Sequence, residues 1–74
     1  MKEKLVSKDY LEREFDIAVL EFELSYNTDV IIKREAQRNM KNLLELAMLY
    51  YGFDYADELN HRADVMRKNL GFKN

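Results

Sequence analysis

Apolar residues recur every three or four positions in three stretches of the 74-residue chain, which is the period of an amphipathic α-helix. The stretches cover about residues 8–26, 29–51 and 55–70, and short polar segments separate them. Short connections place consecutive helices antiparallel. The pattern predicts an all-α fold, a three-helix antiparallel bundle in which a long helical hairpin is followed by a shorter third helix. Residues 1–74 are expected to form a single helical domain.

Capping residues and glycines mark the expected helix ends, because the chain has no proline. The expected N-caps are Ser7 for the first helix, Asn27 or Thr28 for the second, with Asp29 favouring its positive end, and Asp54 for the third. Gly52 and Gly71 follow the second and third helices, where a left-handed conformation is predicted. The apolar Phe72 after Gly71 fits a Schellman arrangement.

Helical projection indicates which face of each helix is buried. The expected core stripes are Leu11, Phe15, Ala18, Val19, Phe22 and Tyr26 on the first helix, Ile32, Ala36, Met40, Leu43, Leu44, Ala47 and Tyr51 on the second, and Ala56, Leu59, Ala63, Met66 and Leu70 on the third. The last turns of the second helix, residues 46–51, are apolar on all sides. Several neighbours must therefore cover that end.

The first helix carries a second, narrower apolar stripe roughly opposite its core face. This stripe consists of Tyr10, Ile17, Leu20 and Leu24. The two neighbours of a helix in a triangular bundle lie about 60° apart, so they cannot cover opposite faces. We expect the stripe to mediate self-association as a homodimer, because contiguous exposed apolar surface is uncommon on monomers. The alternative is a stripe that is partly exposed or covered by Leu5 and Val6.

Composition is consistent with a homodimer. A chain this short buries only about 60% of its unfolded surface, so its stability is modest without further support. The chain has no cysteine for disulfides and a single histidine, which leaves oligomerisation as the means of support. The hydrophobic fraction of 47% beside 35% charged residues describes a globular chain.

Charge is unevenly distributed, although the formal net charge is only −2. The net charge is −4 over residues 1–29, +2 over residues 30–51 and 0 over residues 52–74. The basic residues of the second helix, Lys33, Arg34, Arg38 and Lys41, are placed as in proteins that track phosphates. Because Glu35 and Glu45 border this face and no overall basic excess exists, nucleic-acid binding is the alternative and an interaction with protein is preferred.

Aromatic and methionine side chains cluster where the second helix meets the third. The cluster comprises Met48, Tyr50, Tyr51, Phe53 and Tyr55. Tyrosine and methionine are favoured in protein interfaces, which makes this junction a candidate partner-binding surface. The alternative is that these rings close the end of the bundle, with their hydroxyls reaching water.

Residues that could carry catalysis or bind a metal have simpler explanations. Ser7 and Thr28 serve as caps, there is no cysteine nucleophile, and the two glycines are too far apart for a phosphate loop. Glu58 and His61 have the Glu-x-x-His spacing of di-iron bundles, but His61 projects about 170° from the buried stripe. We therefore expect no enzyme activity, no catalytic residues, no metal site and no cofactor.

The stretch Leu44–Ala47, together with Tyr51–Phe53 and Glu58–Asn60, resembles the small helical-hairpin phosphatases of sporulating bacteria, which dephosphorylate response regulators. Their motif is Ser-Gln-Glu-Leu-Asp, and this chain has Ala-Asp-Glu-Leu-Asn, in which only Glu58 and Leu59 match. The differences fall on the defining motif, so the activity of that family is not assigned to this chain.

The N-terminal stretch is charged and lacks the apolar core of a signal peptide, and no segment approaches the roughly 20 apolar residues of a membrane span. We expect a cytoplasmic protein that does not insert into membranes. The preferred hypothesis is a small non-enzymatic interaction or regulatory module that self-associates and binds or inhibits another protein.

Overall fold

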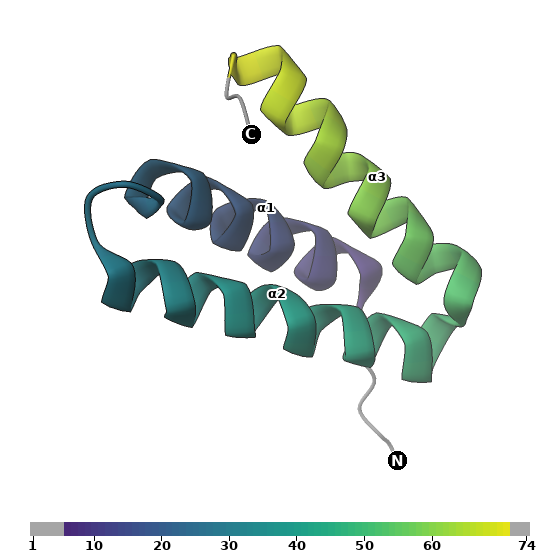
Figure 1. The fold of residues 1–74 in the computed structure, drawn as a ribbon. Coiled ribbons are helices and arrows are strands. Elements are labelled where there is room, and N and C mark those ends of the chain that lie inside the picture. The colour runs from purple at the N-terminus through teal and green to yellow at the C-terminus, as the bar shows by residue number, and fades with distance from the viewer. Residues whose placement is uncertain (1–5, 72–74) are drawn as a thin grey trace.

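The computed structural model describes residues 6–71, which form three helices joined by short turns. Helix α1 spans Lys8–Ser25, α2 spans Val30–Tyr51 and α3 spans Phe53–Leu70. α2 runs antiparallel to α1, and α3 returns in the direction of α1 (Figure 1). The all-α class and the helical bundle predicted from the sequence are confirmed.

Side-chain caps fix the beginnings of the first two helices. Ser7 caps α1 as predicted, and its hydroxyl accepts a hydrogen bond of 3.0 Å from a backbone N–H in the first turn. The prediction that Asn27 or Thr28 caps α2 is wrong, because the cap is Asp29, whose carboxylate accepts two backbone N–H groups at 3.1 Å each. The carboxylate also meets the positive end of the helix dipole. Thr28 instead donates its hydroxyl to the carbonyl of Leu24, at 3.2 Å.

Glycines occupy both ends of α3. The prediction that Asp54 caps α3 is wrong, because the helix already begins at Phe53 and Gly52 occupies the N-cap position. Gly52 has φ 95° and ψ 173°, a conformation almost restricted to glycine, in place of the left-handed one predicted. Gly71 does adopt the predicted left-handed conformation, with φ 81° and ψ 12°. Phe72, predicted to complete the Schellman arrangement, lies outside the described residues.

The core lies where the three apolar stripes meet. Its buried apolar residues are Leu11, Phe15, Ala18, Val19, Ala36, Leu43, Ala47, Tyr55, Ala56, Leu59 and Ala63. Each helix contributes at least one alanine to this set. The alanines allow the helices to pack closely, because their side chains are small. The larger Phe15 and Leu59 fill the remaining space between the helices.

All three predicted core stripes become exposed at one end of the bundle, where α1 turns into α2. Tyr26 at the end of α1, Ile32 near the start of α2 and Leu70 at the end of α3 are all exposed. The sequence predicts each of them to be buried, and these three predictions are wrong. The bundle is therefore closed at the α2–α3 junction and open at the α1–α2 turn.

The opening arises because α3 diverges from α2 towards its C-terminus (Figure 1). The ring of Tyr51 in α2 packs against Tyr55 of α3. From Tyr51 back to the middle of α2, the same row contains Met48, Leu44 and Met40. Towards the N-terminus the same row continues as Gln37 and Lys33. Polar side chains lose hydration when they are buried without partners, so α3 does not pack against this part of α2.

Helix length and hydropathy also bear on membrane association. Within residues 6–71, no helix combines the length and the apolar character that a membrane crossing requires.

Candidate interaction surfaces

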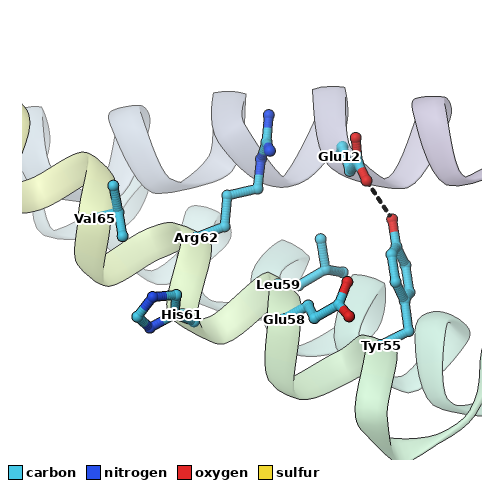
Figure 2. Close-up of a pocket in the computed structure, with 7 residues that line it drawn as sticks. All are labelled: Glu12, Tyr55, Glu58, Leu59, His61, Arg62 and Val65. Atoms are coloured by element: carbon cyan, nitrogen blue, oxygen red, sulfur yellow. Dashed lines mark hydrogen bonds between the residues drawn. The ribbon is translucent and has the colours of Figure 1, made fainter.

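A shallow groove of about 300 Å³ lies between α1 and α3 (Figure 2). Its lining residues are Glu12, Tyr55, Glu58, Leu59, His61, Arg62 and Val65. The hydroxyl of Tyr55 donates to Oε2 of Glu12 at 3.0 Å. Burial raises the pKa of Tyr55, and the hydrogen bond to Glu12 raises it further, so the hydroxyl remains a donor. These groups hold α3 against α1.

Two arginines of α3 continue this connection towards the open end. Arg62 forms a bidentate pair with Asp16, in which Nε lies 2.8 Å from Oδ1 and Nη2 lies 2.9 Å from Oδ2. The pKa of Arg62 is raised by this hydrogen bond. Arg67 forms a tighter contact, with Nε 2.6 Å from Oε2 of Glu23, whose side chain is only 3% exposed. The carboxylates on this flank of α1 are therefore matched by cations of α3.

The Glu-x-x-His pair does not converge on a common point. Figure 2 shows the imidazole of His61 pointing away from α1, while the carboxylate of Glu58 points towards Tyr55. His61 is exposed. Within the described part of the chain, no three His, Asp, Glu or Cys residues gather where they could hold a metal ion.

The second apolar stripe of α1 is divided among three surroundings. Tyr10 and Ile17 are exposed and line a groove between α1 and α2. Leu20 is half-buried and lines a different groove, formed with Val65 and other residues of α3. Leu24 is 66% exposed and lies beside the α1–α2 turn. Tyr10, Ile17 and Leu24, which are seven residues apart along α1, therefore stay exposed on one face of the helix, whereas Leu20 is partly covered by α3.

The aromatic junction divides into an inner and an outer group. The inner group is Tyr51 and Tyr55, whose rings meet edge to face with centroids 5.3 Å apart. The hydroxyl of Tyr51 donates to the carbonyl of Val6 at 2.6 Å, and Nζ of Lys8 lies about 5 Å from both ring centroids. These two rings close the end of the bundle around the start of α1. Leu5, the other residue suggested to cover α1, lies outside the described residues.

The outer group at the junction is accessible to other molecules. Tyr50 and Phe53 are exposed, and Phe53 shows 73% of its surface to solvent. Leu49, which the sequence analysis did not select, is exposed beside them, whereas Met48 is half-buried. Of the predicted partner-binding residues, only Tyr50 and Phe53 are thus freely presented at this end.

A further apolar surface surrounds the α1–α2 turn and is absent from the sequence-based predictions. This turn patch comprises Leu24, Tyr26, Val30, Ile31 and Ile32, all of which are exposed. A signal for it exists in the sequence, because three consecutive apolar residues at a helix start point in directions about 100° apart. No single neighbour can bury all three of Val30, Ile31 and Ile32.

The basic residues of α2 do not all share one environment. Arg34, Arg38 and Lys41 are exposed, and within residues 6–71 no ion pair engages them. Lys33 is half-buried, and its Nζ lies 4.2 Å from the centroid of the Tyr26 ring. Three of the four predicted residues therefore form an open basic row, while the fourth makes a cation–π contact with the turn.

The groove between α1 and α2, here the hairpin groove, has a volume of about 420 Å³. Its lining residues, all from these two helices, are Tyr10, Glu14, Ile17, Ala18, Glu21, Asn39, Asn42, Leu43 and Leu46. Leu43 and Ala18 are buried at its base, and the carboxylates of Glu14 and Glu21 lie on the α1 side. The groove thus combines a mixed apolar and amide lining with one acidic edge.

Comparison of the chain with protein-family models, with curated proteins and with solved structures finds no match.

Proposed function

We propose that this protein is a small non-enzymatic interaction module that self-associates and binds or inhibits another protein. The turn patch is the observation that carries the proposal. Leu24 and Ile31 show 66% and 68% of their surface to solvent, and three more apolar side chains surround them within nine residues of the chain. So many large exposed apolar side chains in one short segment are uncommon on monomers and favour an interaction site.

The turn patch suits self-association better than the outer face of α1. Two of its charged neighbours, Asp29 and Lys33, are engaged in the helix cap and in the contact with a tyrosine ring. On α1, by contrast, Ile17 is flanked by Glu14 and Glu21. Two copies packed through Ile17 would bring acidic side chains together in either helix orientation, and like charges oppose association.

Replacing Leu24 and Ile31 by glutamate is expected to give a folded monomer. Both side chains are exposed, so glutamate can reach water and the helices persist, while two charges at the centre of an apolar contact prevent association. Light scattering measures the mass, and circular dichroism monitors the helix content. Phe53→Glu, at an equally exposed site outside the patch, is the control and should leave the mass unchanged. A wild-type protein that is a monodisperse monomer at high concentration contradicts self-association.

Nucleic-acid binding is the second candidate, and the open basic row of α2 is the observation that favours it. We expect no binding to arbitrary duplex DNA at moderate salt, because the net charge of −2 opposes approach to phosphates. A binding constant measured against salt concentration checks this result. A slope near −3 in log–log form would indicate about three neutralised phosphates and support the second candidate. Arg38→Glu should then abolish binding.

A further inference from the structure

α1 carries a pair of carboxylates on each of its two flanks, and the members of each pair are seven residues apart. The pair towards α3 is Asp16 and Glu23, and the pair towards α2 is Glu14 and Glu21. Seven residues correspond to about two helical turns, or roughly 10 Å along the axis. Each pair therefore lies in line along its flank.

α3 demonstrates which kind of helix such a flank binds. Its arginines at positions 62 and 67 pair with the two carboxylates, and the smaller Leu59 and Ala63 are buried in the core between the helices. The occupant of this flank is thus an amphipathic helix with an apolar stripe and two basic side chains beside it.

The other flank faces no such cations. Across the hairpin groove, α2 presents Asn39 and Asn42, and none of its four basic residues lines the groove. Within residues 6–71, neither Glu14 nor Glu21 takes part in an ion pair. Two aligned carboxylates therefore border a groove of mixed apolar and polar lining, and no cation of residues 6–71 pairs with them.

The hairpin groove also offers apolar contacts from both of its helices. The base contains Ala18, whose side chain is a single methyl group, so the backbone of an occupant can approach α1 closely. Ile17 and Leu46 offer apolar contact on either side. A groove between two helices that offers apolar contacts, with charge at its edge, can bind the apolar face of an amphipathic helix.

We propose that the hairpin groove binds one amphipathic helix of another protein, with an apolar stripe against Ile17 and two basic side chains on Glu14 and Glu21. The occupant lies along α1 as α3 does on the opposite flank. This inference rests on the proposed function, since it names the chemistry of the partner. A second copy fits less well, because its α1 is acidic and its basic row carries Arg38 where the groove requires an apolar side chain.

The test uses the 74-residue protein and two labelled synthetic helices of 18 residues, the length of α3. The peptides share a leucine and alanine stripe and differ only in having lysine or glutamate beside it. Fluorescence anisotropy should show that the lysine peptide binds and the glutamate peptide does not. The affinity for the lysine peptide should fall with added salt, because exposed ion pairs are screened.

Charge reversal at the groove gives the sharper comparison. The double variant Glu14→Lys with Glu21→Lys should lower the affinity for the lysine peptide by about tenfold or more. The same variant should bind the glutamate peptide, which the wild type does not bind. The matched control is Glu45→Lys with Asp57→Lys, which changes the net charge equally at exposed sites outside the groove. Its affinity for the lysine peptide should stay within about twofold of wild type.

Mapping the bound peptide by nuclear magnetic resonance separates this inference from the proposed function. Signal changes at Ile17 and Leu46 support the groove. Binding at the turn patch, or equal binding to the charge-reversed variant, overturns the assignment of the groove but leaves an interaction module. No binding of the lysine peptide at millimolar concentration also overturns the inference, while the light-scattering test at Leu24 still decides self-association.

Discussion

Replacing Phe15 by alanine should destabilise the fold by about 3–5 kcal/mol and leave much of the protein unfolded at room temperature. Phe15 is completely buried and is the largest of the fully buried side chains. The substitution removes a buried aromatic ring and leaves a cavity that the surrounding helices can close only in part. Domains of this size have stabilities near the lower end of roughly 5–15 kcal/mol, so the loss approaches the total.

Denaturant titration followed by circular dichroism measures this effect, with Phe53→Ala as the matched control. The control deletes the same side chain where it is 73% exposed, and it should change the free energy of unfolding by no more than about 0.5 kcal/mol. Equal effects of the two substitutions would contradict the placement of the core. If Phe15→Ala is too unfolded to titrate, Leu59→Ala, at another fully buried side chain, extends the comparison.

The helices were predictable from local signals, because each signal acts within a few residues. The hydroxyl of Ser7 accepts a hydrogen bond from a backbone N–H in the first turn of α1. Gly71 readily adopts the positive φ that ends α3. Burial at the open end was not predictable from the same signals. Ile32 lies on the apolar stripe of α2 that forms the core. The pattern of that stripe does not indicate where α3 diverges from α2 and leaves it exposed.

The candidate surfaces depend on which flank of a helix each neighbour occupies. Projection places Leu20 and Ile17 on one stripe of α1, yet the structure turns the first towards α3 and the second towards α2. The ion pairs that decide this arrangement join residues 44 or more positions apart. Periodicity along one helix contains no information on such contacts.

The acidic side chains of α1 lie on two flanks of the helix with different surroundings. The sequence shows an acidic first helix, and the structure shows that half of its paired carboxylates hold α3 while Glu14 and Glu21 border an open groove. A single helix thus provides the central contact of the bundle and one wall of the surface proposed for a partner. Binding there requires no rearrangement of α3, because α3 packs on the opposite flank.

The buried ion pair between α3 and α1 should prove sensitive to the loss of one partner. Arg67→Met leaves the carboxylate of Glu23, only 3% exposed, without a cation, and is expected to destabilise the fold by about 3–5 kcal/mol. Arg62→Met is the control, because that pair is more exposed and such pairs contribute only about 0–1 kcal/mol.

The double replacement Glu23→Leu with Arg67→Met distinguishes the value of the pair from the penalty for breaking it. Removing both charges eliminates the unpaired carboxylate, so the double variant should be close to wild type or more stable, as judged by its midpoint of denaturation. A double variant as unstable as Arg67→Met alone would mean that the packing of the arginine stem, and not the buried charge, dominates. Such a recovery would mean that the pair adds little net stability and acts mainly to fix where α3 lies on α1.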